Sequence, residues 1–230
     1  MLSIIIPTLD AAACLGATLD SLAEARASGL VGEVVVVDGG SVDGTVALAT
    51  ARGARLVQAA QGRGPQLAAG ALAATGDWFL FLHADTCLAM GWGEVAGRFM
   101  GDPAMARQAG AFALRFDSGA PQARRLERLV AWRSRWLGLP YGDQGLLLAR
   151  RFYLELGGFR PLPLMEDVEF VRRIGLRRLK RLASHAITSA SRYERDGWIR
   201  RSARNLVCLV LWYLGVPAGQ LRRLYAGRRR

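Results

Sequence analysis

The chain has 230 residues, of which 51% are hydrophobic and 22% charged, and its formal net charge is +12. This length supports a full hydrophobic core in one domain, and the composition excludes the disordered and low-complexity classes. The three cysteines, Cys14, Cys87 and Cys208, lack CxxC and Cys/His zinc spacings, which excludes a disulfide framework and favours a reducing compartment.

The first half of the chain alternates short apolar runs with helix-length segments. The first run starts at the N-terminus without a basic flank and stops at Pro7, so it indicates a buried strand rather than a signal peptide. Runs such as VVVV at 34–37 do not alternate with polar residues, as is typical of strands covered on both faces. The order predicts a parallel, doubly wound sheet with strands at 3–6, 33–37, 55–57 and 78–82 and helices at 11–27, 43–52 and 66–74.

Beyond residue 110 the pattern is less regular, and function tends to reside in such insertions. We expect strands at 111–116 and 146–149, helices at 122–137, from about 151 and near 167, a loop at 140–145 and a turn at 157–158.

The C-terminal tail, residues 191–230, is basic and partly apolar, and we separate it from a domain spanning residues 1–190. Residues 170–230 hold 16 Lys and Arg against 2 acids. We expect a helix over about 198–214 and a short last helix ending at 228–230. The apolar segment LVCLVLWYLGV at 206–216 is shorter than the roughly 20 residues that span a membrane. Flanked by arginines, it suits a bilayer interface, the protein's own core or an oligomer contact.

Polar residues follow several predicted strands, at the edge where parallel sheets bind ligands. Asp38 follows the VVVV run and precedes GGSVDGT, whose glycines let backbone N–H groups face a ligand. Its carboxylate either accepts the N–H of a nucleobase or fixes the turn. Ser41 and Asp43 are candidates for helix caps.

His83 and Asp85 follow the apolar run at 78–82. An unpaired carboxylate beside such a strand is costly, and a divalent cation bridging Asp85 to a diphosphate would offset that cost. Asp85 is also suited to cap the following segment. His83 is either a contact to ribose or phosphate or an ordinary core histidine.

Glu166 and Asp167 open the amphipathic segment DVEFVRRIG, where one carboxylate can cap a helix. They also make a catalytic rim, because a transferase acting on an anomeric carbon needs a carboxylate to take the acceptor's proton. Asp167 is the candidate for that role. Arg63 lies in GRGP before a predicted helix, a pattern that suits a phosphate. The absence of GxGxxG and GxxxxGK[ST] argues against a dehydrogenase and a P-loop NTPase.

Taken together, the segments SIIIPTLD, VVVVDGGSVDGT, GRGPQLAAGALAATGD, FLFLHADT, PYGDQG, LGGF and LMEDVEF resemble family 2 glycosyltransferases of the GT-A fold, in order and spacing. The likeness covers roughly residues 1–185. The tail, SASRYERDGWIRRSARNLVCLVLWYLGVP, is similar to a bacterial subgroup described as arsenosugar-biosynthesis or radical-SAM-associated glycosyltransferases. The resemblance implies an α/β, Rossmann-like, mainly parallel doubly wound sheet with a helical basic tail.

The resemblance also implies a set of roles by position. A nucleoside-diphosphate sugar of the UDP type would donate a single sugar, with inversion, to a small or lipid-linked acceptor. The cofactor would be Mn²⁺ or Mg²⁺. The residues implied at the nucleotide are Pro7, Thr8, Asp10, Asp38 and Asp85, and the residue patterns above add Gly40, Arg63 and His83. Those implied elsewhere are Asp85 and His185 at the metal, Asp167 with Glu166 in catalysis, and Gly142, Asp143 and Gln144 on the acceptor side.

This chain departs from the family pattern at two places. Many relatives carry Asp-x-Asp where this chain has His83-Ala84-Asp85, so the first carboxylate is missing. The Gln-x-x-Arg-Trp signature of processive members is absent, and Arg192 to Trp198 occupies a loosely comparable place. We therefore expect transfer of one sugar rather than polymerisation.

Two other function classes stay open at this point. A nucleotidyltransferase should carry a Gly-rich basic loop after the first strand, where this chain has PTLDAAACL. A basic membrane- or nucleic-acid-binding module suits the tail, but acids along the sheet edge argue against a phosphate-backbone surface, and we expect no specific nucleic acid. We expect a cytoplasmic enzyme with peripheral contact of residues 199–230 to the inner face of the cell membrane, and the oligomeric state stays open.

Overall fold

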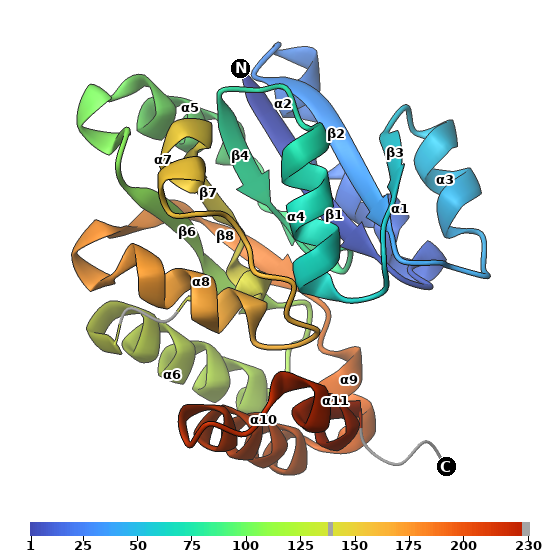
Figure 1. Ribbon diagram of the computed structural model, residues 1–230, viewed down its shortest axis with the longest axis vertical. Helices are drawn as coiled ribbons and strands as arrows, with labels where there is room; N and C mark the ends of the chain where they lie inside the picture. The colour runs from blue at the N-terminus through green and yellow to red at the C-terminus, as the bar shows by residue number, and fades with distance from the viewer. Residues whose placement is uncertain (138–139, 227–230) are drawn as a thin grey trace.

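The computed structural model describes residues 1–137 and 140–226, and within them one eight-stranded mixed sheet runs through the molecule (Figure 1). Its strand order is β3-β2-β1-β4-β7-β6-β8-β5. The strands are β1 Leu2–Thr8, β2 Val31–Asp38, β3 Arg55–Gln58, β4 Trp78–Phe81, β5 Thr86–Leu88, β6 Ala109–Phe116, β7 Leu146–Ala149 and β8 Leu179–Thr188.

The N-terminal half of the sheet confirms the predicted parallel arrangement. β1 pairs in parallel with β2 and β4, and β2 pairs in parallel with β3. The helices of this half are α1 Ala12–Asp20, α2 Ala23–Ala27, α3 Thr45–Ala51 and α4 Arg63–Ala73. The prediction of a single helix over 11–27 is wrong, because the chain forms two helices there with a break around Ser21. The Ser21 hydroxyl donates to the Thr18 carbonyl at 2.7 Å and accepts the Leu88 N–H at 3.1 Å, which ties this break to β5.

The other half of the sheet is mixed. β7 lies antiparallel between β4 and β6, β8 runs parallel to β6, and β5 pairs antiparallel with β8 at the edge. The helices here are α5 Trp92–Gly101, α6 Pro121–Leu137, α7 Arg150–Glu155 and α8 Glu166–Ile174, with 3-10 turns at Pro103–Met105, Gly142–Gln144 and Leu176–Arg178. The sequence did not predict β5, β8 or α5.

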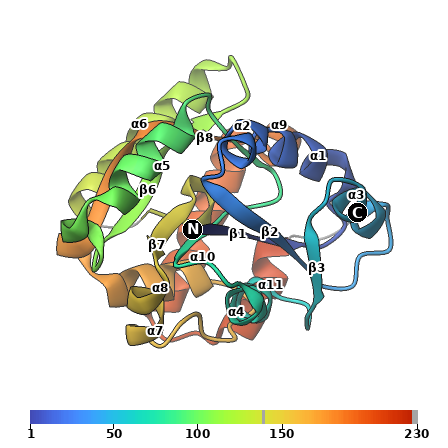
Figure 2. The ribbon, with the colours of Figure 1, turned by 90° about the horizontal axis from the view of Figure 1, so that it is seen from above.

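Helices cover both faces of the sheet, as Figure 2 shows with α1, α2 and α5 on one side and α4, α7 and α8 on the other. The alternation of β1 explains this layering. Ile4 and Ile6 pack in the cluster that includes α1 and α5, whereas Ile5 packs in the cluster that includes α4 and α8. Because consecutive strand residues point to opposite faces, a strand that is apolar at every position needs cover on both sides.

The tail forms α9 Ser191–Asp196, α10 Trp198–Tyr213 and α11 Ala218–Ala226, which lie together in the lower part of Figure 1. Trp198 packs with Phe116 and Val130, and Cys208 with Met165 and Val168. The predicted helix from about 198 is confirmed, and the predicted end at 228–230 lies outside the described residues. The domain boundary at residues 190 and 191 stays a prediction. Over the described ranges, none of the helices combines the length and apolarity needed to cross a bilayer.

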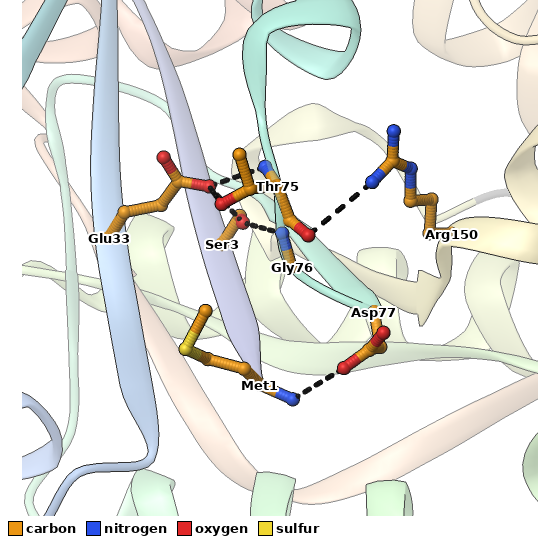
Figure 3. A network of polar contacts seen from close by, with 7 residues as sticks. All are labelled: Met1, Ser3, Glu33, Thr75, Gly76, Asp77 and Arg150. Atoms are coloured by element: carbon orange, nitrogen blue, oxygen red, sulfur yellow. Dashed lines mark hydrogen bonds and ion pairs between the residues drawn. The ribbon is translucent and has the colours of Figure 1, made fainter.

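A closed polar network ties the N-terminal ends of β1, β2 and β4 together (Figure 3). One oxygen of the Glu33 carboxylate accepts from Ser3 Oγ at 2.6 Å and from the Thr75 N–H and hydroxyl at 2.6 and 2.8 Å. The N-terminal amine pairs with Asp77 at 3.0 Å. This end of the sheet therefore has its polar groups paired with one another.

Candidate active site

The predicted ligand edge lies at the C-terminal ends of β1, β2 and β4. Thr8, the last residue of β1, stands opposite Asp38, the last residue of β2. β4 ends at Phe81 on the other side of β1, and His83 and Asp85 follow it. The parallel register therefore brings the predicted residues of three strands to one edge, as the sequence indicated.

Asp38 is buried, and its carboxylate is bonded to its own turn and to β1. It accepts the N–H groups of Gly40 and Ser41 at 3.0 and 2.9 Å. It also accepts the hydroxyl groups of Thr8 and Ser41. Burial alone would raise the pKa of Asp38, but these hydrogen bonds outweigh it and hold that pKa below its usual value. The geometry therefore shows an ionised carboxylate that fixes the turn, and contact with a base stays a prediction.

The loops after β1 and β2 are tied together by further carboxylates. Asp10, at φ 49°, accepts the Val42 N–H at 2.9 Å, and its own N–H donates to Ser41 Oγ at 2.9 Å. Asp43 accepts the N–H of Thr45 at the start of α3 and the N–H of Ala12 at the start of α1. Asp43 thus caps two helices, whereas Ser41 joins Asp38 to Asp10 instead of capping α3. Pro7 is buried within β1 opposite Val37.

Gln66 is a structural residue of this edge that the sequence did not reveal. Its side chain is buried in α4, and its amide nitrogen donates to the carbonyls of Thr8 at 2.7 Å and Val37 at 2.8 Å. The first turn of α4 also touches the segment before α8, because the Gly64 N–H donates to the Leu162 carbonyl at 3.2 Å. A Cβ at Gly64 would clash with that backbone. Gln66 and Gly64 therefore fix where Arg63 stands.

Asp85 differs from Asp38 because its carboxylate accepts no hydrogen bond from any described residue. Its one ion pair is with Arg192 of α9, whose Nη2 lies 3.6 Å from Oδ2. The Asp85 carbonyl accepts the Ser189 N–H at 3.1 Å, so the backbone of this loop is held to the chain just before α9. Arg192 is therefore a second site residue that sequence reasoning did not assign.

His83 lies half-buried against Gly142, where a Cβ would clash with the imidazole. Burial and the positive charge of Arg63 lower the pKa of His83 to about 4. The side chain is thus a neutral imidazole at neutral pH. It also lines a small cavity of about 20 Å³ that reaches Glu166 and Asp167.

Glu166 and Asp167 begin α8 directly after Met165, which adopts a left-handed φ of 64°. Asp167 accepts the Gly142 N–H at 2.9 Å, which joins the predicted base to the predicted acceptor loop, and it also accepts the Val168 N–H at 2.8 Å. Glu166 is 1% exposed, and neither of its carboxylate oxygens has a hydrogen-bond partner among the described residues. Burial first, and the charge of Asp167 second, raise the pKa of Glu166 to about 7.

The loop at 142–144 places one carboxylate near the site and sends one amide away from it. Burial raises the pKa of Asp143 to about 6, and one of its oxygens is buried without a partner among the described residues. Gln144 instead holds the loop in place, since its amide donates to the Phe112 carbonyl at 2.9 Å and accepts from Ser134. Contact of these residues with an acceptor stays a prediction.

Arg63 is a half-buried cation that interacts electrostatically with Glu166, Asp167 and Asp85. It makes no direct ion pair with a described residue. Burial alone would lower the pKa of Arg63, but Tyr225, Glu166, Asp167 and Asp85 raise it above its usual value. The guanidinium thus remains charged, and it attracts the carboxylates of Asp85, Glu166 and Asp167.

Comparison with known proteins places the chain in a family. Residues 3–156, more than half of the chain, match the family model for Glycosyl transferase family 2. The chain belongs to this family. A PGL/p-HBAD biosynthesis glycosyltransferase of Mycobacterium tuberculosis is 44% identical over 95 residues, which cover 38% of this chain and 36% of that protein. The family 2 chain therefore spans little more than a third of the curated relatives it matches.

Solved structures show the same fold. Glucosyl-3-phosphoglycerate synthase from Mycobacterium tuberculosis, in complex with Mn²⁺, UDP and glucosyl-3-phosphoglycerate, superposes with a TM-score of 0.56 at 21% identity, covering 82% of this chain and 70% of that one. TarS 1–349 of S. aureus, in complex with UDP-GlcNAc, gives a TM-score of 0.62 at 19% identity, covering 82% and 58%. The family 2 chain thus has the predicted GT-A-like arrangement.

His185, predicted from the sequence as a metal ligand, lies apart from Asp85. His185 is exposed on β8, and its carbonyl pairs with the N–H of Ala89 rather than with the loop at Asp85. Thr188, which contacts the Asp85 carbonyl, is three residues further along β8, a span of roughly 10 Å. Within residues 1–137 and 140–226, no group of three or more His, Cys, Asp or Glu side chains is arranged to hold a metal ion. The structure therefore does not bring His185 to Asp85.

Proposed function

We propose that this protein transfers one sugar from a nucleoside-diphosphate sugar to an acceptor hydroxyl, with Asp167 as the general base. One observation carries the proposal. The edge that holds the β1 and β2 turns also holds Asp85, whose carboxylate accepts no hydrogen bond from a described residue, and Asp167, which is anchored to Gly142 at 2.9 Å. Sugar transfer needs a nucleotide site, a metal site and a base beside the acceptor, close to one another. The Asp38 turn, Asp85 and Asp167 supply these three groups at one edge.

The donor side lies along the turns that follow β1 and β2. The rigid turn at Asp38 and the loop at Asp10 present backbone and carboxylate groups suited to a base and ribose, beside Pro7, Thr8 and Gly40. Arg63 supplies a positive charge for the diphosphate. A donor of the UDP type is supported by related folds that hold UDP with Mn²⁺ and UDP-GlcNAc.

Asp85 is suited to hold Mn²⁺ or Mg²⁺. Its carboxylate oxygens are free of hydrogen bonds from the described residues, and a hard cation prefers such oxygens. One protein carboxylate is enough for Mg²⁺-type sites, where substrate phosphates and water complete the coordination. A bound cation would balance the charge of the departing diphosphate. We assign Arg192 to the same diphosphate, because it already lies 3.6 Å from Asp85.

Asp167 would accept the proton of the acceptor hydroxyl as the acceptor oxygen forms its bond to the anomeric carbon. In the same displacement the bond from that carbon to the diphosphate oxygen breaks, and its electron pair leaves with the nucleoside diphosphate. One direct displacement inverts the anomeric centre. The hydrogen bond from Gly142 fixes the orientation of the Asp167 carboxylate, and Gly142 and Asp143 would border the acceptor on a loop that Gln144 holds in place. Glu166 lies beside Asp167 as a second carboxyl group at this edge.

We also propose a narrower assignment, a single-transfer enzyme of the arsenosugar-biosynthesis or radical-SAM-associated subgroup. The tail sequence is similar to that subgroup, and the absence of the Gln-x-x-Arg-Trp signature of processive members supports single transfer. Arg192, in the part of the tail loosely comparable to a processive signature, contacts Asp85 in this chain. Transfer of more than one sugar to each acceptor molecule would contradict single transfer.

Thermal unfolding with a panel of nucleoside diphosphates and their sugars, with and without Mn²⁺, tests the proposal. A ligand that binds only the folded state raises the melting temperature by mass action. We expect a Mn²⁺-dependent rise with UDP compounds that is retained in Asp167→Asn. The absence of any shift across the panel would overturn the proposed donor.

A further inference from the structure

Two helices at one end of the molecule expose apolar stripes to solvent. On α10 and at the residue that follows it, the exposed apolar residues recur at helical spacing and form a stripe of Ile199, Ala203, Leu206, Val207, Val210, Tyr213 and Leu214. Ile199 is 84% exposed and Leu214 75%. A solvent-facing helix surface is normally polar, so a stripe of this length is a signal of interaction rather than of folding.

α6 carries a second stripe of a different kind. Leu129, Trp132 and Trp136 are 59%, 54% and 61% exposed. Exposed arginines alternate with them at Arg125, Arg128 and Arg135. The helix has one acid, Glu127, which is turned inward and bonded to Arg124 and to the backbone of Phe116. The exposed side of α6 is thus basic, aromatic and free of acids.

The two helices share one hydrophobic cluster where α10 begins. Val130 of α6 packs in the same cluster as Trp198 at the start of α10, and Figure 1 shows both helices at the end of the molecule away from the N-terminus. α10 itself contains no acidic residue, and Arg200 stands exposed beside Ile199. Other exposed large apolar residues, such as Leu72 on α4 and Leu154 on α7, lie on separate helices.

We propose that the α10 stripe and the exposed side of α6 form a docking face for an anionic lipid bilayer. Leucine, valine and isoleucine side chains enter the boundary between headgroups and acyl chains, tryptophans lie at headgroup level, and arginines attract the anionic headgroups. The positive charge of this face favours anionic lipid over a second copy of this chain. Two copies that met through this face would bring the same arginines together, with no acidic residues opposite them.

Docking has a consequence for the acceptor, and this consequence rests on the proposed function. The inner side of α10 packs through Cys208 on Met165 and Val168, the residues that flank Glu166 and Asp167. The stripe is therefore about one helix diameter, roughly 10 Å, from the start of α8. An acceptor anchored in the bilayer would present its hydroxyl group to Asp167 at that height.

Vesicle flotation with the full chain tests the docking face. Vesicles of equal parts phosphatidylglycerol and phosphatidylcholine should carry the protein, and pure phosphatidylcholine vesicles should carry much less. We expect Leu206→Asp with Val210→Asp to reduce binding at least tenfold. Trp132→Ala with Trp136→Ala should also reduce it, and Arg128→Gln with Arg135→Gln should remove most of its salt dependence.

The matched controls are Leu72→Asp and Leu154→Asp, which place the same charge at helix positions outside the face that are at least as exposed. Circular dichroism checks that each variant is folded.

An equal loss of vesicle binding in the control variants would overturn the proposal. So would a wild-type protein that binds neither kind of vesicle. A dimer that Val210→Asp converts to monomer, without vesicle binding, would identify a second copy as the occupant. None of these readouts needs a sugar nucleotide, so retained Mn²⁺-dependent donor binding separates failure of docking from failure of the proposed function.

Discussion

Glu33 and Glu166 lie at opposite ends of the same sheet and have opposite electrostatic environments. At the N-terminal end, Glu33 accepts three hydrogen bonds (Figure 3). Burial opposes its ionisation, but these bonds and Arg55 prevail and lower its pKa. At the C-terminal end, Glu166 has no hydrogen-bond partner for either oxygen among the described residues, and its pKa rises to about 7. The same side chain is a structural anchor in one place and an unsatisfied group in the other.

The contrast recurs within the candidate site itself. Asp38 is as deeply buried as Glu166 but accepts hydrogen bonds from its own turn and from Thr8 of β1, whereas Asp85 and Asp143 keep carboxylate oxygens without such bonds from the described residues. A buried polar group without a partner costs stability, so a fold that retains several of them at one edge sacrifices stability for binding or chemistry. The paired carboxylates hold the edge in shape, and the unpaired ones are those to which we assign metal binding and chemistry.

The largest expected effect comes from Asp167→Asn. The amide keeps an oxygen for the Gly142 N–H but cannot take the acceptor's proton. We expect kcat to fall by about a hundredfold to ten-thousandfold, with Mn²⁺-dependent donor binding nearly unchanged. Steady-state kinetics with melting curves for donor binding provide the measurement. Asp102→Asn, in the turn after α5, is the control and should keep its activity. Unchanged turnover in Asp167→Asn would remove the base assignment.

Asp85→Ala should have the next largest effect, on binding rather than on chemistry. Loss of the carboxylate proposed to hold the cation should weaken Mn²⁺-dependent donor binding at least tenfold, about 1.4 kcal/mol. Titration calorimetry with UDP and Mn²⁺ measures this. Asp20→Ala removes a surface carboxylate paired with Arg52 and should leave binding unchanged. Equal Mn²⁺-dependent affinity in Asp85→Ala and wild type would place the cation elsewhere.

Glu33→Gln tests the structural end of the comparison. The neutral amide is a weaker acceptor for Ser3 and Thr75, so we expect a loss of about 1–2 kcal/mol of unfolding free energy at pH 7. Because the folded pKa of Glu33 is lowered, its contribution is present above the unfolded value and is lost as pH falls through the folded value. The gap between variant and wild type should therefore narrow at pH 3 in urea unfolding. Glu24→Gln, on an exposed carboxylate of α2, should change little at either pH.

The sequence predicted the parallel half of the sheet well because its strands are uninterrupted apolar runs. It missed β8, whose buried face is built from Leu182, Ser184, Ala186 and Thr188. Small and polar residues on a buried face give no hydrophobic run. β5 has three residues and is held by pairing with β8, so no local pattern indicates it.

The candidate site was predictable in its local parts and not in its distant contacts. Residues directly after strands stood out because a parallel sheet gathers strand ends at one edge. Gln66 and Arg192 did not stand out, since their partners lie 58 and 107 residues away in sequence. Which carboxylates are satisfied also depends on such contacts. Asp38 takes most of its hydrogen bonds from its own turn and one from Thr8 of β1, whereas the isolation of Glu166 follows from the packing of α8 against α4 and the tail.

Glu166→Gln comes last because its effect appears only as pH rises, and this pH dependence is the sharpest test of the comparison. Because burial and Asp167 raise the folded pKa from 4.5 to about 7, the folded state holds the proton more tightly than the unfolded state. Wild-type stability should therefore fall as pH rises from about 4.5 to about 7, with Arg63 offsetting part of the loss. The neutral variant lacks this penalty, so it should gain about 1–3 kcal/mol relative to wild type between pH 5 and pH 8. Urea unfolding at the two pH values gives the difference. Glu166→Gln should thus raise the unfolding free energy relative to wild type, whereas Glu33→Gln should lower it. If Glu166→Gln instead became less stable than wild type as pH rises, the Glu166 carboxylate would be ionised and paired in the folded protein.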